Sequence, residues 1–217
     1  YTADMADEER FDAALQASSG CFQAAGYTWD EASGKFTAAP EGAKMSYEVI
    51  VPASGGEDHP AYLLCEYVRQ ALDSIGITLV INNPSDDNVI WNALNANTEE
   101  MWTAAWSSSI APDMYQTWHS KNVVGAPGST GSNHAYLIDE QLDQLIMDAR
   151  VSPDQEYRKA IYKECLDIIK DWGVEVPYYQ RQNIYVVSVE RVNVDTITPD
   201  INPYWNWMND IQNIEMN

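Results

Sequence analysis

Residues 45–84 read MSYEVIVPASGGEDHPAYLLCEYVRQALDSIGITLVINNP, and this stretch decides the fold. Apolar side chains recur at every second position over 45–51 and again over 77–81, the period that indicates strands. Between them Pro60 opens a segment with apolar residues at helical spacing, and Gly76 follows its end. The connection is long enough for a crossover, so strand, helix and strand in this order predict a parallel pair within an α/β sheet.

The flanking sequence extends the same alternation. We expect a helix before this stretch, over 6–25, and a third, largely buried strand after it, over 101–106. The expected fold class is therefore α/β, with a mixed, mostly parallel sheet flanked by helices. The other expected elements are a short helix over 89–95, a short helix over 112–119, a Gly- and Ser-rich loop over 121–133, a helix over 142–149, a helix that begins with a capping box at Ser152 and ends before Gly173, one long or two short strands over 174–189, and a tail over 190–217 without clear periodicity.

Composition and charge exclude several classes of protein. The 217 residues include 12 Lys plus Arg and 33 Asp plus Glu, which gives a net charge of −21. Such a charge repels phosphate backbones and anionic lipid headgroups, so we expect neither nucleic acid nor a membrane surface as a partner. No apolar run approaches the roughly 18 residues of a membrane span, so no membrane insertion is expected. The chain begins at Tyr1 without an initiator Met and reads as a mature product or an excised fragment.

The sequence contains none of the common catalytic or cofactor motifs. Its three histidines lack H-E-x-x-H spacing, and it contains neither a G-x-S-x-G elbow nor a P-loop or G-x-G-x-x-G motif. We therefore expect a protein that is not an enzyme, with no catalytic residues, metal site or cofactor. Cys21, Cys65 and Cys165 all fall within helical patterns, and we interpret them as buried free thiols.

Aromatic residues without ionisable partners point to binding rather than catalysis. The chain has eight Trp and thirteen Tyr, and Trp106 ends an expected buried strand directly before Ser107 and Ser109. The carboxyl ends of strands in open α/β sheets face the ligand crevice, so Trp106 with these hydroxyls forms the predicted ligand site.

Two histidines bracket the loop over 121–133. His119 stands beside Ser120, and His134 stands beside Asn133. Either pair could reach a ligand, although the commoner role of such a histidine is that of a loop residue satisfied by backbone or solvent.

Several strings and their order resemble the carboxyl-terminal lobe of family 5 extracellular solute-binding proteins, the oligopeptide- and dipeptide-binding components of ABC importers. The match is specific because of the order and spacing of the strings. They are AAGYTWDEASGKFT (24–37), ALDSIGITLVI (71–81), AAWSSSIAPDMYQTWHS (104–120), IDEQLDQLIMDAR (138–150) and PDQEYRKAIYKECLDIIKDWGVEVPYYQRQNIYVVS (153–188).

The resemblance implies one lobe of a periplasmic-binding-protein-like, class II two-lobed fold. Residues 1–182 would form the carboxyl-terminal ligand-binding lobe, and residues 183–217 would be a tail that packs with the missing first lobe. The implied function is capture of a short peptide or other small polar solute for ABC permease subunits. The implied location is extracellular and anchored at the cell surface, or periplasmic, with the signal peptide upstream of Tyr1.

Site residues follow from the resemblance where its motifs align. Peptide-binding members carry W-x-x-D at the strand end, and Trp106 matches the Trp that lines the pocket, whereas Ser109 occupies the position of the Asp. A neutral hydroxyl cannot replace the charge-assisted bond that a carboxylate gives to a peptide's amino terminus. The string GSNHAY (131–136) resembles the family's N-x-G-Y stretch and places Tyr136 at its aromatic position.

Two alternatives to import stay open at this point. One is an extracellular peptide-sensing or adhesion module without transport; an enzyme such as a peptidase is the less favoured alternative.

Overall fold

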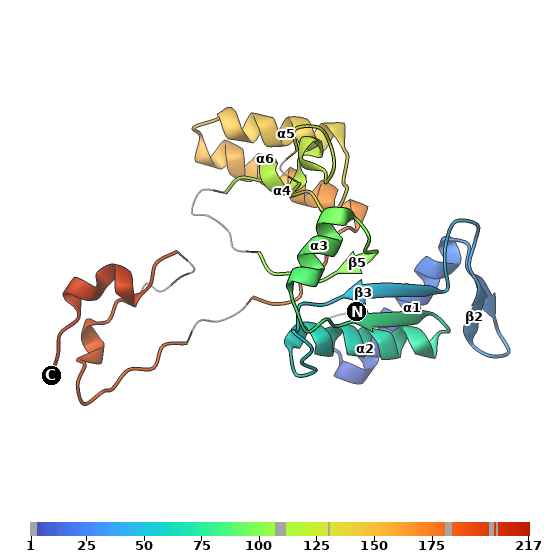
Figure 1. Ribbon diagram of the computed structural model, residues 1–217, viewed down its shortest axis with the longest axis horizontal. Coiled ribbons are helices and arrows are strands. Elements are labelled where there is room, and N and C mark those ends of the chain that lie inside the picture. Colours follow the sequence, from blue (N-terminus) through green and yellow to red (C-terminus); the bar gives the residue numbers. More distant parts are fainter. Residues whose placement is uncertain (1–3, 107–111, 130, 181–183, 200–201, 203) are drawn as a thin grey trace. The chain divides into compact units, whose positions relative to one another are not determined.

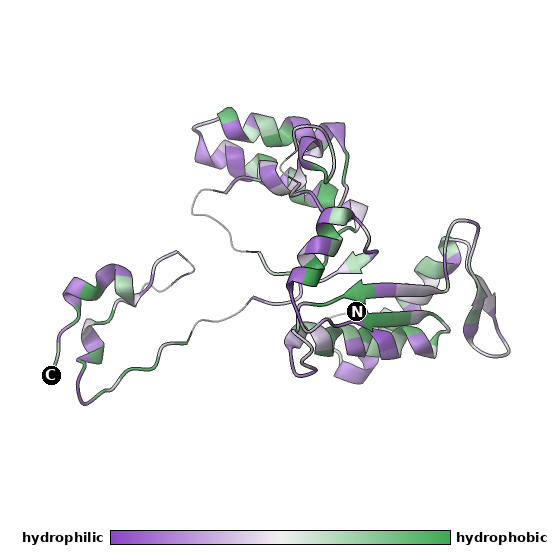
Figure 2. Ribbon diagram, viewed as in Figure 1, coloured by the Kyte–Doolittle hydropathy of each residue, from purple (hydrophilic) through white to green (hydrophobic). Residues whose placement is uncertain are grey.

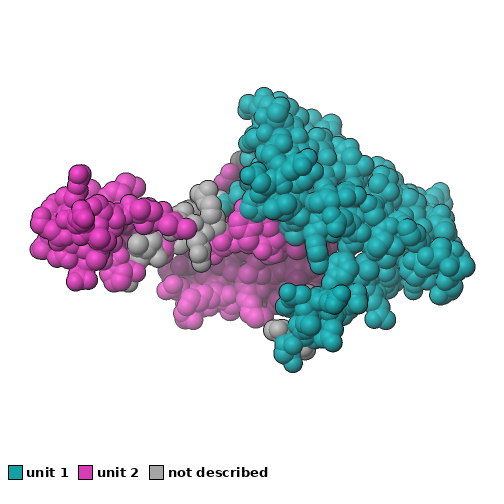
Figure 3. Space-filling model, turned by 90° about the horizontal axis from the view of Figure 1, so that it is seen from below, with its two compact units in different colours: residues 1–106 teal, residues 107–217 magenta. Residues whose placement is uncertain are grey.

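The computed structural model describes residues 4–106, 112–129, 131–180, 184–199, 202 and 204–217. The chain divides into two compact units, Tyr1–Trp106 and Ser107–Asn217, which Figure 3 colours separately.

Unit 1 is built on a parallel three-stranded sheet. Its strands are β3 (Ser46–Ile50), β4 (Thr78–Asn82) and β5 (Met101–Trp102), in the order β4-β3-β5, and both pairings are parallel (Figure 1). β3 and β4 pair along their whole length, from Ser46 with Thr78 to Ile50 with Asn82. The parallel α/β sheet predicted from 45–84 is confirmed.

Alternate residues of β3 enter two different cores. Val49 packs with Leu79 of β4 and Cys65 of α2 (Pro60–Ser74), whereas Ile50 packs with α3 (Asn88–Ala96) through Ile90 and Leu94. Both faces of the sheet are therefore covered by a helix at β3, as the two-residue period of a buried strand requires.

A helix and a hairpin precede the sheet. Helix α1 (Asp7–Ala24) leads into β1 (Thr28–Asp30) and β2 (Lys35–Ala38), an antiparallel pair that the sequence analysis did not predict. Phe22, Tyr27 and Phe36 form the aromatic core of this region, with ring centroids 5.0 to 6.0 Å apart. The pKa of Tyr27 is raised to about 12, mainly because the side chain is buried and to a smaller extent because it is hydrogen-bonded to Tyr47.

Unit 2 is centred on an antiparallel helix pair, α5 (Glu140–Val151) and α6 (Gln155–Trp172). Hydrophobic and hydrophilic residues alternate along both helices (Figure 2), and the buried positions include Leu142, Ile146 and Cys165. Before this pair lie α4 (Tyr115–Trp118) and the short 3-10 helix η1 (Ser120–Asn122), and after it lie η2 (Val194–Thr196) and η3 (Trp207–Asn213).

Two expected boundaries are wrong. The strand expected over 101–106 is only Met101–Trp102, because it pairs with just the last two residues of β3, and Met101 is 38 % exposed at this edge. Helix α6 is capped by Asp154, whose Oδ1 accepts hydrogen bonds from the backbone N–H groups of Glu156 at 2.9 Å and Tyr157 at 3.2 Å. Ser152 instead ends α5 and accepts a bond from the Asp154 N–H through its Oγ.

The strand expected over 174–189 is also absent from the described part of that range. Residues 174–180 and 184–189 have exposed side chains, with Val186 at 92 %, and belong to no strand. Residues with high strand propensity form a strand only where another strand supplies the hydrogen bonds, and no strand of the described residues pairs with this range. The domain boundary predicted between 182 and 183 stays a prediction.

Two further properties bear on the sequence expectations. Cys65 and Cys165 are buried free thiols, as predicted. Cys21 is a free thiol that is exposed on α1, so the prediction that it is buried is wrong. None of the helices in the described ranges is both long and apolar enough to cross a membrane.

Candidate functional site

Trp106 follows β5 by four residues and is 54 % exposed at the end of unit 1. It therefore does not end a buried strand, but its indole is accessible, as a ligand-contacting residue must be. The predicted site residues Ser107 and Ser109 lie outside the described residues.

His119 is buried and makes several contacts within unit 2. Only 5 % of the residue is exposed, and its Nδ1 atom accepts a hydrogen bond from the Lys121 N–H at 3.2 Å. The same nitrogen lies 3.3 Å from a carboxylate oxygen of Asp143, and the ring packs against Tyr115 with centroids 4.6 Å apart. These contacts favour a structural role, and the predicted ligand contact of His119 stays a prediction.

Asp143 on α5 ties the start of the loop to the helix pair. Its carboxylate accepts hydrogen bonds from both the backbone N–H, at 2.8 Å, and the hydroxyl of Ser120. Asp143 thereby satisfies an N–H at the beginning of η1 that the short helix itself cannot pair.

Asn133 closes the loop that starts there. Its side chain is fully buried, and its Nδ2 donates to the carbonyl oxygens of Trp118 at 3.3 Å, His119 at 3.3 Å and Leu137 at 3.0 Å. Its backbone N–H donates to the carbonyl of Asn122 at 2.9 Å. Asn133 thus joins the end of α4, the end of η1 and the segment that leads into α5.

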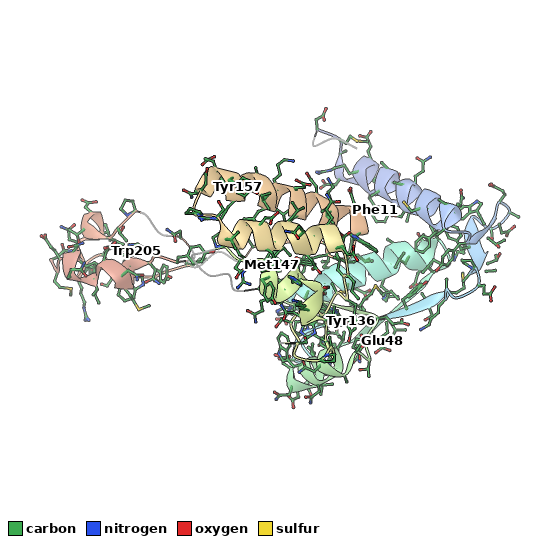
Figure 4. The ribbon with its side chains drawn as sticks, turned by 90° about the horizontal axis from the view of Figure 1, so that it is seen from above. Phe11, Glu48, Tyr136, Met147, Tyr157 and Trp205 are labelled. Atoms are coloured by element: carbon green, nitrogen blue, oxygen red, sulfur yellow. The ribbon has the colours of Figure 1, made fainter. Side chains whose placement is uncertain are left out.

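His134 and Tyr136 follow directly on this junction, and both are half-buried. Tyr136, labelled in Figure 4, has a backbone φ of 55°, the left-handed region that a residue with a large side chain rarely adopts. Its hydroxyl donates a hydrogen bond to the carbonyl of Val124 at 3.2 Å, which holds the far side of the loop.

The structure therefore brings together three of the predicted site residues, His119, His134 and Tyr136, around one loop of unit 2, while Trp106 lies in unit 1. Sequence reasoning placed Asn133 at the edge of this loop as a possible ligand contact, but the structure buries it at the centre of the loop's hydrogen bonds. Sequence reasoning did not identify the role of Asp143. An acidic residue in the first turn of a helix is common, so the pattern over α5 gives no sign that Asp143 binds Ser120.

A separate hollow of about 350 Å³ lies in unit 1 beside β3. Its polar lining includes Lys44, which forms an ion pair with Glu100, and the neighbouring carboxylates of Glu48 and Glu99. The pKa of Glu99 is raised, mainly by burial and to a smaller extent by the negative charges of Glu48 and Glu100. Across the described ranges, no three His, Cys, Asp or Glu side chains are grouped so as to hold a metal ion.

Comparison with known proteins gives matches by structure only. No family model and no curated protein matches the sequence. AppA, the oligopeptide-binding protein of Bacillus subtilis solved with a nonapeptide, matches 80 % of this chain and 32 % of its own, with a TM-score of 0.54 and 17 % identity. The oligopeptide-binding protein of Thermus thermophilus, solved with a pentapeptide, matches 72 % of this chain and 28 % of its own, with a TM-score of 0.55 and 19 % identity.

A third neighbour was solved with a different kind of molecule. NikZ of Campylobacter jejuni in complex with Ni(L-His) matches 71 % of this chain and 29 % of its own, with a TM-score of 0.55 and 16 % identity. The fold is therefore that of part of a two-lobed, periplasmic-binding-protein-like protein. More narrowly, the fold is similar to part of the oligopeptide- and nickel-binding substrate-binding proteins of ABC transporters. The chain spans less than a third of the length of each of these three neighbours.

Proposed function

We propose that this chain is the carboxyl-terminal lobe of the substrate-binding component of an ABC importer. It holds a short peptide or another small polar solute against a second lobe and delivers it to the permease subunits. The protein acts outside the cytoplasmic membrane, either at the cell surface or in the periplasm. The ligand-contacting residues of the proposal are Trp106, Ser107, Ser109, His119, His134 and Tyr136.

The proposal rests on the similarity of the fold to that of substrate-binding proteins. This chain covers less than a third of the length of each of those neighbours. A two-lobed clamp needs both lobes to surround its ligand, and exposed aromatic residues on one lobe become buried when the clamp closes. The 54 % exposure of Trp106 supports this reading. In this proposal the protein binds and releases its ligand without changing it chemically.

In the full-length protein, Trp106→Ala is expected to weaken ligand binding by about tenfold or more, because an aromatic side chain that becomes buried on binding contributes strongly to affinity. Native mass spectrometry of the protein purified from its host identifies the bound solute by mass, and calorimetry with that solute measures the loss. Trp91→Ala, on α3 and 49 % exposed, is the matched control and is expected to leave affinity unchanged. Equal affinity of the Trp106→Ala variant and the unaltered protein would remove Trp106 from the site.

The 217-residue chain alone is expected to bind the same solute weakly or not at all, because half of the enclosing surface is missing. Calorimetry on the chain and on the full-length protein, under the same conditions, makes the comparison. Micromolar binding by the chain alone would contradict the two-lobed proposal.

A further inference from the structure

We infer that Asn133 is the positioning residue of the proposed ligand site: it fixes the backbone that presents His134 and Tyr136. The inference rests on the proposed function for the ligand, but its geometry rests only on hydrogen bonds within unit 2. Asn133 does not itself contact a ligand, because its side chain is fully buried.

The two Nδ2 hydrogens of Asn133 are shared among three carbonyl oxygens from two separate parts of the chain. Two of these carbonyls, of Trp118 and His119, lie at the end of α4, where a helix leaves its last carbonyl groups without intrahelical partners. The His119 carbonyl also accepts from the Asn122 N–H at 3.0 Å. The third, of Leu137, lies one residue after Tyr136 and is the shortest of the three contacts at 3.0 Å. The amide group therefore joins the two arms of the loop over 119–137.

The side chain acts here only as a donor. No donor among the described residues reaches the Oδ1 atom of Asn133, although this atom is buried. An unpaired buried acceptor costs stability, so the three donor contacts must offset that cost as well as the burial of the amide. A purely apolar residue would avoid the cost but would remove the donor that the carbonyls of Trp118 and Leu137 share, whereas the His119 carbonyl would keep its bond from the Asn122 N–H at 3.0 Å.

The hydrogen bonds of Asn133 matter most for the backbone conformation of Tyr136. Its φ of 55° is a conformation that costs a residue with a side chain on the order of 1–3 kcal/mol unless neighbouring contacts impose it. Those contacts include the Asn133 bond to Leu137 and the burial of the Leu137 side chain on one side, and the Tyr136 hydroxyl bond to Val124 on the other. Loss of the first would free the backbone of Tyr136 to relax and would turn its ring away from its present direction.

Asn133→Ala in the full-length protein tests the inference with two measurements. Hydrogen exchange of the amides over 131–137 is expected to become about tenfold to a hundredfold faster, while the amides of α5 and α6 keep their protection. Binding of a defined mixture of tri- to pentapeptides and, separately, of Ni(L-His) is expected to weaken about tenfold for whichever probe the unaltered protein binds. If Asn133→Ala fails to fold, Asn133→Ser, which keeps one donor, takes its place.

Asn122→Ala is the matched control. Asn122 is also a buried asparagine of this loop, and its Nδ2 donates to the Tyr115 carbonyl at 2.8 Å, a bond between η1 and α4. Its backbone carbonyl, which accepts from Asn133, is unchanged by the substitution. We expect Asn122→Ala to lower stability without changing exchange over 131–137 or probe affinity.

The outcomes separate the inference from the proposed function. Unchanged exchange over 131–137 in the Asn133 variants overturns the inference, and so does faster exchange with unaltered probe affinity, because Asn133 would then only stabilise the loop. If the unaltered full-length protein binds neither probe and carries no solute from its host, the proposed function fails, while the exchange measurement still decides whether Asn133 fixes Tyr136.

Discussion

Replacing Asn133 by aspartate is expected to destabilise unit 2 by on the order of 4 kcal/mol at neutral pH, although the two side chains have nearly the same shape. The aspartate can place only acceptors where Asn133 now donates to the carbonyls of Trp118, His119 and Leu137. Acceptors would then face acceptors at a position with no solvent exposure. Burial of a charge and repulsion from three carbonyl dipoles add to the loss of the hydrogen bonds.

The loss is expected to depend on pH with a definite sign. Burial and the facing carbonyls disfavour the carboxylate, so the pKa of the new carboxyl group is raised in the folded state above its unfolded value of about 3.9. Below the unfolded pKa the group is neutral in both states, its hydroxyl can donate to one carbonyl, and the variant is at its most stable. As pH rises above that value the unfolded state ionises first, so stability is lost progressively until the folded group ionises as well.

Urea denaturation of Asn133→Asp, followed by the helical circular dichroism signal at about pH 4 and about pH 7, measures both the size and the sign. Asn206→Asp is the matched control, because the Asn206 side chain acts as an acceptor for the Met208 N–H at 2.9 Å and aspartate can accept the same bond. The control is expected to change stability little. A loss in Asn133→Asp that is equal at both pH values would contradict the donor-only role of Asn133.

The elements that the sequence predicted well are those whose signal is local. The strand, helix and strand of 45–84 are confirmed because each element carries its own periodicity and its own start or stop residue, such as Pro60 at the beginning of α2. The range 174–189 is also rich in Val, Ile and Tyr, yet its described residues form no strand, because a strand also needs a pairing partner that composition does not supply.

The candidate site was predictable to a smaller extent. The sequence pointed to Trp106 and to both sides of the loop over 121–133, and the structure shows Trp106 exposed and His119, His134 and Tyr136 at the loop. The bonds of Asn133 join carbonyl groups 14 and 15 residues earlier and 4 residues later in the chain, and no spacing rule encodes them. The positive φ of Tyr136 is equally invisible, since the sequence offers no glycine at that position.

Gly76→Ala is expected to destabilise unit 1 by on the order of 3–4 kcal/mol, the second large effect that the structure predicts. Gly76 follows α2 with a φ of 84°, a conformation that favours glycine. A Cβ atom at this position would lie 2.6 Å from the backbone oxygen of Phe36. That backbone cannot move away easily, because the Phe36 N–H donates to the Ile75 carbonyl at 2.8 Å and the Phe36 ring lies in the aromatic core.

Gly173→Ala separates the two causes of this loss. Gly173 ends α6 with a φ of 65°, so it carries a similar conformational cost, but no atom lies within 4 Å of the position of its Cβ. We therefore expect Gly173→Ala to cost only about 1–2 kcal/mol, the part that comes from the left-handed backbone. The difference between the two variants in urea denaturation measures the steric contact between the end of α2 and the hairpin. An equal loss of stability in the two variants would show that the β1–β2 hairpin moves away at Phe36 to make room for the Cβ atom. The hairpin would then not be packed rigidly against the segment between α2 and β4.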